Sequence, residues 1–290
     1  MSPFGSVEDV VRALDDVGYL ADEGLATAVF LATTLGRPLL LEGEPGVGKT
    51  SAATALARAL GTRFLRVQCY EGLGVGEALY EWNYQRQLLA TRLAEVSVAA
   101  LAQADLFTEE FLVERPILAA VRHRGEQAPV LLVDEIDRAD DEFEAMLLEF
   151  LGEAAVTVPE LGTFTARRAP VVVLTSNRSR ELHDALRRRC LYHWIEYPTP
   201  ARAVAILRRS VPSASEPLLA DVAAFVGSVR DLDLDKPPGL AEAIDWVAAL
   251  GALGVTELVH DDVVRTLSAL TKTPDDHATV TGALVTLGYP

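Results

Sequence analysis

Basic side chains are scarce in this chain of 290 residues, and lysine is the rarest of them. Lys and Arg together number 26 against 42 Asp and Glu, which gives a formal net charge of −16. Contacts to phosphates dominate the affinity of proteins for nucleic acid, so this acid surplus argues against a general nucleic-acid binder. Lys49 is the only lysine that precedes Lys236.

Cysteine and histidine are also rare, with two Cys and five His. Cys69 and Cys190 do not have the spacing of metal ligands, and the histidines are scattered, so the sequence predicts no zinc or iron site. We expect both cysteines to be small buried side chains in a reducing cytoplasm.

Long apolar runs are missing too, and none approaches the roughly 20 residues that a helix needs to span a bilayer. Residues 1–10 include Glu8 and Asp9 and lack a basic region followed by an apolar one, so we expect no signal peptide. Half of the residues are hydrophobic, which is typical of a globular chain. The sequence therefore predicts a cytoplasmic globular protein without stable membrane insertion.

The rare lysine stands at the end of a glycine-rich loop. The loop and the residue after it are Gly43, Glu44, Pro45, Gly46, Val47, Gly48, Lys49, Thr50 and Ser51. The backbone N–H groups of such a loop can surround nucleotide phosphates, with Lys49 at the outer phosphates and the Thr50 hydroxyl on Mg²⁺. An apolar strand at 38–42 and an Ala/Leu-rich helix at 51–60 are expected to flank it. This strand–loop–helix context predicts a site for a nucleoside triphosphate such as ATP.

Strands and helices alternate as far as residue 198, and only helical segments follow. The expected strands are 38–42, 63–67, 129–133, 170–175 and 191–195. The alternation predicts an α/β nucleotide-binding domain over 1–198 with a parallel sheet flanked by helices, and the tail predicts a small all-helical lid domain over 199–290. We expect an irregular insert at about 70–115 and a β-hairpin at about 155–168.

Two acids, Asp134 and Glu135, follow the apolar run that ends at Val133. Ligands of open α/β sheets bind at the carboxyl ends of the strands. Asp134 is placed to hold Mg²⁺ through water, and Glu135 could polarise the water that attacks the γ-phosphate. Many strands end in exposed acids, so Asp134 and Glu135 indicate a nucleotide site only in combination with the glycine-rich loop.

Two later features have an ordinary structural alternative. Asn177 follows the next strand and could contact the γ-phosphate and orient water, or it could cap the helix after it. Arg187, Arg188 and Arg189 run from a helix end into a strand. One of them could act on a neighbouring subunit's nucleotide as an arginine finger, or all three could be favourable charge at a helix C-terminus.

These features, taken in order, resemble those of AAA+ ATPases. The run from Asp134 to Ala139, the insert before it, the hairpin after it and the helical tail resemble the MoxR family. Shorter strings at 68–73, 79–84 and 236–239 are similar to the CoxD-like group, which is associated with maturation of carbon monoxide dehydrogenase and related molybdenum hydroxylases.

The resemblance implies an ATP-hydrolysing chaperone that remodels or matures a client metalloenzyme. It implies a hexameric ring of identical subunits whose ATP sites lie between neighbours, and a von Willebrand factor A-domain protein that bridges the ring to the client. It places the finger at Arg189, with Arg188 as the alternative. It also places the adenine near Gly18, Tyr19 and Leu20.

The chain departs from the family pattern at two positions. Cys190 stands where the family usually has an aromatic residue, which blurs the register of the finger. Gly239 stands where the family has a tail arginine. Either Lys236 substitutes for that arginine, or the tail does not sense the γ-phosphate.

Two other functions therefore stay open. A nucleotide-dependent switch with little hydrolysis would agree with Gly239, and a nucleic-acid motor is disfavoured by the acid surplus. Residues 163–209 hold ten arginines against three acids, and residues 214–290 hold twelve acids against four bases. The asymmetry is either solvated surface or a head-to-tail contact between identical subunits.

The insert is the segment where we would expect client contact. Tyr80, Trp82 and Tyr84 share one face if the segment is extended. That face either packs on the core or contacts the client.

Overall fold

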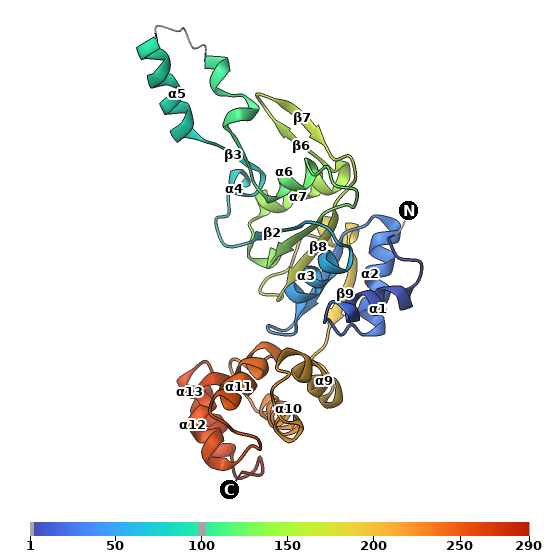
Figure 1. Cartoon of the computed structure of the whole chain (residues 1–290), viewed down its shortest axis with the longest axis vertical. Helices are drawn as coiled ribbons and strands as arrows, with labels where there is room; N and C mark the ends of the chain where they lie inside the picture. The colour runs from blue at the N-terminus through green and yellow to red at the C-terminus, as the bar shows by residue number, and fades with distance from the viewer. Residues whose placement is uncertain (1–2, 98–102, 290) are drawn as a thin grey trace. The chain divides into compact units, whose positions relative to one another are not determined.

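The computed structural model describes residues 3–97 and 103–289 (Figure 1). Residues 98–102 of the expected insert lie outside these ranges. The chain forms two compact units. The first unit comprises Met1–Val17, Ala21–Glu42 and Thr50–Trp194, and the second comprises Gly18–Leu20, Gly43–Lys49 and Ile195–Pro290. The expected domain boundary after residue 198 stays a prediction.

A five-stranded sheet with the order β2-β5-β8-β1-β9 lies at the centre of the first unit. Its strands are β1 (Leu39–Gly43), β2 (Phe64–Gln68), β5 (Val130–Asp134), β8 (Val171–Ser176) and β9 (Leu191–Ile195). The pairs β2–β5, β5–β8 and β1–β8 are parallel. Every residue of β1 and β5 is buried, as expected for parallel strands that helices cover on both faces. The predicted α/β fold class is confirmed.

Helices accompany this sheet, and α3 among them corresponds to the helix predicted at 51–60. They are α1 (Val7–Asp16), α2 (Glu23–Leu35), α3 (Lys49–Ala59), α4 (Val75–Leu79), α5 (Tyr84–Ser97), α6 (Pro116–Val121), α7 (Asp141–Glu153) and α8 (Asp184–Arg189). Aspartate caps begin two of them, because the Asp22 carboxylate accepts from the Leu25 N–H at 2.6 Å and Asp140 accepts from Phe143 at 2.9 Å.

Short elements fill the insert and the hairpin. They are β3 (Tyr80–Trp82), η1 (Gln103–Leu106), η2 (Glu109–Phe111), β4 (Leu112–Glu114), β6 (Ala155–Val158) and β7 (Gly162–Thr165). Another short element, η3 (Ile136–Arg138), follows β5. Strands β6 and β7 form the predicted hairpin, whereas the antiparallel β3–β4 pair was not predicted.

The three aromatic residues of the insert do not share one face. The backbone is extended only as far as Trp82, and Tyr84 already begins α5. Trp82 is 7% exposed and packs edge-on against Phe107, with 5.2 Å between ring centroids, whereas Tyr84 is 65% exposed. Trp82 is therefore a core residue, and Tyr84 faces away from that core.

In the second unit, the described residues from 199 onward form helices and connecting turns. The helices are α9 (Pro200–Ser210), α10 (Glu216–Arg230), α11 (Leu240–Ala252), α12 (His260–Leu270) and α13 (Pro274–Ala283). Trp246 lies fully buried among them, and its Nε1–H donates to the Thr266 hydroxyl at 2.7 Å. The helical tail agrees with the prediction. A search of the described residues finds no helix with the length and apolar character needed to cross a membrane.

Candidate nucleotide-binding and hydrolysis site

Two predicted site residues meet at the carboxyl end of the sheet in the first unit. Asp134 ends β5, and its carboxylate is 2% exposed. The Thr50 hydroxyl donates to this carboxylate at 3.1 Å from each oxygen, and the Thr175 hydroxyl donates to Oδ1. The end of the glycine-rich loop and the acid strand, 84 residues apart, are therefore joined directly.

Arg66 on β2 forms an ion pair with Asp134 that sequence reasoning missed. The only sequence signal is a basic residue within the strand predicted at 63–67, which the structure places beside β5. A buried carboxylate needs a cationic partner to offset its lost hydration. Asp134 and the Thr50 hydroxyl are the oxygen ligands that Mg²⁺ prefers, so the residues fit this ion, which could replace Arg66.

Glu135 has an unusual backbone conformation, with φ of 54°. For a residue with a side chain, this left-handed region costs roughly 1–2 kcal/mol. Its backbone N–H donates to the Thr175 hydroxyl at 2.9 Å, which fixes it beside Asp134. Its carboxylate lies 3.0 Å from Nε of Arg138, and the side chain is 32% exposed. The acid is therefore accessible to water while its backbone is held in place.

Asn177 lies in a loop that a buried carboxylate holds. Asp137 is 3% exposed, and its Oδ2 accepts from the backbone N–H of Asn177 at 3.2 Å and of Ser179 at 2.8 Å. In the described part of the chain, the Asn177 side-chain amide forms no hydrogen bond. The residue that caps α8 is His183, so the helix-cap interpretation of Asn177 is wrong.

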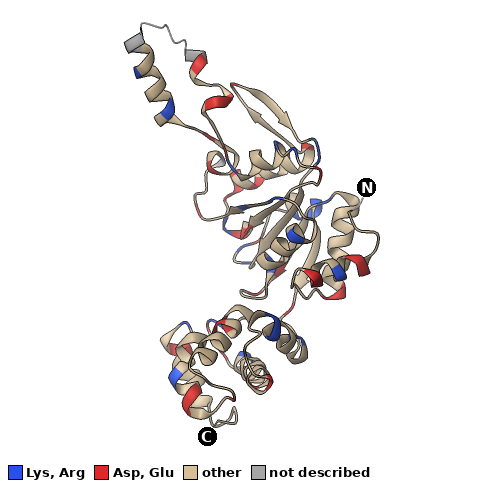
Figure 2. Cartoon of the chain, in the orientation of Figure 1, with Lys and Arg blue, Asp and Glu red and all other residues tan. Residues whose placement is uncertain are grey.

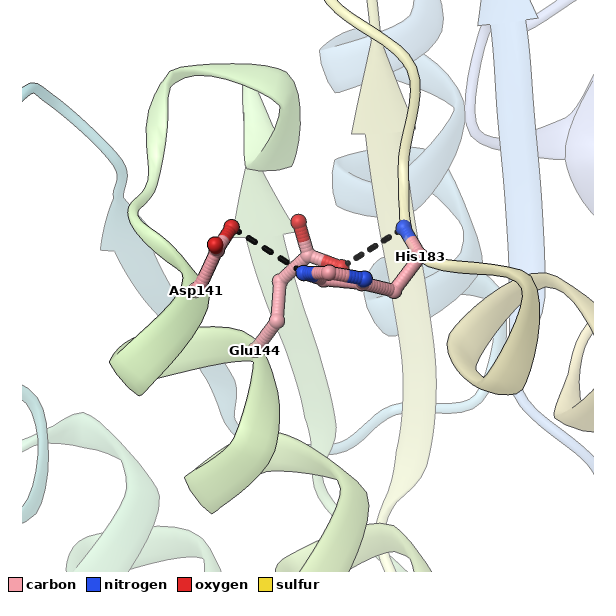
Figure 3. A group of neighbouring side chains, drawn as sticks. All are labelled: Asp141, Glu144 and His183. Atoms are coloured by element: carbon pink, nitrogen blue, oxygen red, sulfur yellow. Dashed lines mark hydrogen bonds and ion pairs between the residues drawn. The ribbon is translucent and has the colours of Figure 1, made fainter.

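A second buried carboxylate, Glu144, holds the other end of this loop (Figure 3). It pairs with Arg180 and accepts from the His183 N–H at 3.1 Å, while His183 Nε2 lies 3.0 Å from Asp141 Oδ1. One possible ligand atom from each of Asp141, Glu144 and His183 lies within 4.8 Å of the other two, so a single cation could contact all three. Both Glu144 oxygens already have partners, however, and Arg180 supplies the positive charge. We interpret the group as a connection between the loop and α7.

In the second unit, two glycines of the glycine-rich loop have a left-handed backbone conformation. Gly46 has φ of 77° and Gly48 has φ of 95°. Glycine adopts this region without steric cost. Lys49 is 7% exposed, and its Nζ donates to the carbonyls of Gly43 and Glu44, each at 2.8 Å. The lysine thus closes the loop on itself.

The segment expected near the adenine lies beside this loop. A Cβ on Gly48 would sit 3.9 Å from Cε2 of Tyr19, so the Tyr19 ring approaches the loop backbone closely. The Leu20 carbonyl accepts from Arg202 Nη2 at 2.8 Å. The contact with adenine stays a prediction.

Gly239 is in contact with the loop backbone. A Cβ added to Gly239 would lie 2.8 Å from the Gly46 Cα and 2.9 Å from the Pro45 carbonyl oxygen. Such distances leave no room for a side chain. The backbone N–H of Leu240 also donates to the Gly46 carbonyl at 3.1 Å. Close backbone packing thus explains why the expected tail arginine is absent here.

Arg230, which sequence reasoning missed, contacts the loop instead. It lies at the end of α10 and forms an ion pair with Glu44. Its Nη1 donates to the Pro238 carbonyl at 2.7 Å, and its guanidinium lies 4.0 Å from the Tyr197 ring centroid. Lys236, the predicted substitute, is exposed. The available signal was that Arg230 is the only arginine between Arg209 and Arg265.

The candidate finger residues lie at the end of α8. The Arg37 guanidinium donates to the carbonyls of Arg188 at 2.7 Å and Arg189 at 3.1 Å. The Arg189 side chain donates to the Leu148 carbonyl, while the Arg188 side chain is exposed and has no hydrogen bond or ion pair to a described residue. Within the described residues, neither arginine is bonded to Asp134. Arg187 lies 3.7 Å from Glu42.

Comparison with known proteins gives one family and several partial relatives. The family "AAA domain (dynein-related subfamily)" matches residues 38–190, which is more than half of the chain. The Lon protease of Halothermothrix orenii is 30% identical over 142 residues, covering 48% of this chain and 15% of that protein. The Lon protease of Mycolicibacterium smegmatis is 32% identical over 146 residues, covering 48% and 16%. The chain thus spans a small part of these relatives.

Solved structures of RuvB variants from Thermotoga maritima are similar over most of this chain. One is 17% identical with a TM-score of 0.47, covering 98% of this chain and 82% of that one. Another is 16% identical with a TM-score of 0.49, covering 95% and 82%. Scores and identities this low carry no functional argument.

Proposed function

This chain belongs to the AAA domain family, in its dynein-related subfamily, and from that premise we propose that it binds ATP with Mg²⁺ and hydrolyses the ATP to ADP and phosphate. The observation that carries the proposal is the contact of the Thr50 hydroxyl with both oxygens of Asp134 at 3.1 Å. It joins the end of a phosphate-binding loop to the acid that would hold the ion. A loop matched by chance would not need that acid as its neighbour.

Phosphoryl transfer depends on positioning and on stabilising charge. When bound, Mg²⁺ would neutralise phosphate charge and polarise the transferred group. Thr50 and Asp134 would hold the ion, Asp134 through water. Lys49 would exchange its two carbonyl partners for outer phosphate oxygens.

Hydrolysis also needs a positioned water. Glu135 accepts a hydrogen bond from this water and polarises it. Its side chain is 32% exposed, which leaves the carboxylate accessible. The Asn177 amide donates toward the γ-phosphate and the water. Its lack of a hydrogen-bond partner among the described residues supports this role.

We propose that Arg230 takes the place of the missing tail arginine at the loop. Its ion pair with Glu44 brings a guanidinium to the phosphate-binding segment within the second unit. This contact supports active hydrolysis over the alternative of a switch that barely hydrolyses, because Gly239 no longer implies that the tail lacks a cation at the loop.

We propose a ring of identical subunits, six by family resemblance, with Arg188 or Arg189 acting on the neighbour's nucleotide. Arg188 is exposed and has no side-chain partner in the described part of the chain, whereas Arg189 is bonded to Leu148. Arg124, Arg167 and Arg168, together with Glu126, line a hollow of about 360 Å³ on the first unit. Such a basic surface suits the acid-rich tail or loop side of a neighbour.

The client is expected to be a metalloenzyme, and by the MoxR and CoxD-like resemblance a molybdenum hydroxylase such as carbon monoxide dehydrogenase. A von Willebrand factor A-domain partner and a cytoplasmic setting belong to the same proposal. Helix α5 supports client contact because it exposes apolar side chains, although it also carries basic residues, drawn blue in Figure 2. The apolar side chains are Tyr84, Leu88, Leu89 and Leu93, and the least exposed of them, Leu88, is 57% exposed.

The experiment that tests the proposed function replaces Glu135 by glutamine and measures ATP turnover and ATP binding. We expect turnover to fall by about 10²–10⁴-fold, as for loss of a general base, with binding retained. Glu149→Gln, at an exposed position of α7, is the matched control and should leave both unchanged. Unaltered turnover in Glu135→Gln would contradict the assignment. Stimulation of turnover by duplex DNA, with tight binding at moderate salt, would instead favour the nucleic-acid motor.

A further inference from the structure

Two buried carboxylates hold the segment from Asn177 to Arg189 in the first unit, and a third, Glu42, faces the segment without a complete contact. Asp137 and Glu144 accept hydrogen bonds from backbone N–H groups of this segment. The Glu42 side chain is also 2% exposed, yet its Oε2 is a buried oxygen without a hydrogen bond in the described part of the chain. A buried polar atom left without a partner is costly and needs an explanation.

Two arginines of the segment face this oxygen from beyond hydrogen-bonding distance, while the Tyr192 hydroxyl also interacts with the Glu42 carboxylate and does not satisfy Oε2. Arg178 Nε lies 3.8 Å and Arg187 Nη2 lies 3.7 Å from Glu42 Oε2. N–H···O hydrogen bonds are about 2.7–3.2 Å long, so neither contact is complete. A shift of less than about one ångström would bring either N···O distance into this hydrogen-bonding range.

The guanidinium group of each arginine also lies over an aromatic ring. The Arg178 guanidinium lies 5.9 Å from the Trp194 ring centroid, and the Arg187 guanidinium lies 5.9 Å from that of Tyr192. Cation–π contacts of exposed arginines are weak, so they can be exchanged for a charged hydrogen bond. The two side chains are 58% and 36% exposed, which leaves them room to move.

Each of these three residues is adjacent in sequence to a proposed functional segment: the phosphate-binding loop, Asn177 or the finger arginines. Glu42 directly precedes Gly43, where the phosphate-binding loop begins. Arg178 directly follows Asn177, and its own φ is 59°. This left-handed conformation is uncommon for a residue with a side chain, so the surrounding contacts must hold it. Arg187 directly precedes Arg188 on α8.

We propose that Glu42 is a positioning residue that couples the start of the phosphate-binding loop to Asn177 through Arg178 and to the finger helix α8 through Arg187. When nucleotide shifts Gly43, the adjacent Glu42 carboxylate closes on one or both arginines. That movement aligns Asn177 with the γ-phosphate and sets the orientation of Arg188 and Arg189. This regulation rests on the proposed function of the same site.

The first test is kinetic and uses the chain of 290 residues. Glu42→Gln keeps the shape of the side chain and removes its charge. We expect kcat for ATP to fall about tenfold with KM and ADP affinity nearly unchanged, because transition-state alignment is lost and ground-state binding is kept. Glu149→Gln, also a Glu-to-Gln change but on the exposed face of α7, should match the wild type. A wild-type kcat in Glu42→Gln, or a rise in KM that accounts for the whole loss, would overturn the coupling.

A second readout separates this inference from the proposed function. Hydrogen exchange over residues 178–189 is compared with and without Mg-ADP, in the wild type and in Glu42→Gln. We expect nucleotide to slow exchange in the wild type and to have little effect in the variant. Equal protection in both chains, or none in the wild type, would overturn the coupling even if ATP is hydrolysed. Protection lost only in Glu42→Gln would support it even if hydrolysis is never seen.

Folding of the variant is checked by its melting temperature. If Glu42→Gln does not fold, Arg187→Gln replaces it, since that change affects a partly exposed side chain. The same loss of kcat and of nucleotide-induced protection is expected for Arg187→Gln, and wild-type behaviour would overturn the proposal.

Discussion

The two units bury different kinds of polar group. Among its described residues, the first buries the carboxylates of Glu42, Asp134, Asp137 and Glu144, each at most 3% exposed and all at the carboxyl end of the sheet or in the elements beside it. The described tail of the second unit buries a single carboxylate, Asp276, which accepts from the backbone N–H groups of Asp235 and Lys236. Buried charges are costly and tend to gather where chemistry needs them. The difference indicates that substitutions of the buried acids in the first unit mainly alter chemistry, whereas substitutions in the apolar core of the tail mainly alter stability.

The largest expected effect is a loss of stability after a substitution in the core of the tail. Trp246 is fully buried and bonded to Thr266. Trp246→Ala should lower the free energy of unfolding of the second unit by about 3–5 kcal/mol, because it removes a large side chain and leaves a cavity. Thermal unfolding followed by circular dichroism should then show an early, separate transition. A single unshifted transition would mean that the tail core is not an independent source of stability.

Lys49 tests the difference between the two units further, because it is a buried cation that belongs to the second unit. Lys49→Ala should weaken ATP binding by about 100-fold, since several charged hydrogen bonds to phosphate are lost. Isothermal titration with Mg-ATP measures the change. Lys272→Ala is the control, because Lys272 is exposed and its Nζ bonds only the Ala269 carbonyl among the described residues. Equal affinity in Lys49→Ala and the control would remove the lysine from the site.

A smaller effect is expected where a first-unit carboxylate holds a loop rather than the substrate. Asp137→Asn keeps the size of the side chain but weakens its bonds to Asn177 and Ser179. We expect turnover to fall about tenfold, with a stability loss of about 1–3 kcal/mol from the weakened buried hydrogen bonds. Kinetics and urea unfolding, measured together, separate the two effects. Lost stability with unchanged turnover would show that the loop position does not matter for hydrolysis.

The smallest expected effect concerns the buried thiols of the first unit. Burial, more than the nearby acids, raises the pKa of Cys69 to about 12, and burial raises the pKa of Cys190 to about 12. At pH 8 both thiols should therefore be neutral and react with iodoacetamide far more slowly than unfolded cysteine, whose pKa is about 8.5. Mass spectrometry after a timed pulse measures the labelling. Rapid labelling of either native cysteine would contradict its burial.

Much of the fold was predictable because it depends on local pattern. Strand β5 is apolar as far as Asp134, and the phosphate-binding loop contains glycines, whose conformational preferences are strong. The three-residue strands β3 and β4 are too short to show a period, so no local signal marked them. Thr50 and Asp134 were predicted to act together because each belongs to a recognisable motif.

The remaining site contacts could not be predicted, because they join residues far apart in the chain. Arg230 and Glu44 are 186 residues apart, and no spacing rule connects them. Arg66 looked like an ordinary exposed strand residue until its pairing with Asp134 was visible. Glu42 looked like the polar end of an apolar strand, and its significance depends on Arg178 and Arg187, which follow only after three further strands of the sheet have begun.

The most direct test of the central claim, an ATPase site completed between subunits, is ATP turnover per chain over a wide range of protein concentration. The account predicts a rate that rises steeply with concentration and then saturates, because Arg188 or Arg189 of one subunit must reach the nucleotide of the next. A rate per chain that is measurable and independent of concentration would contradict completion between subunits, and a negligible rate at every concentration would contradict the proposed ATPase.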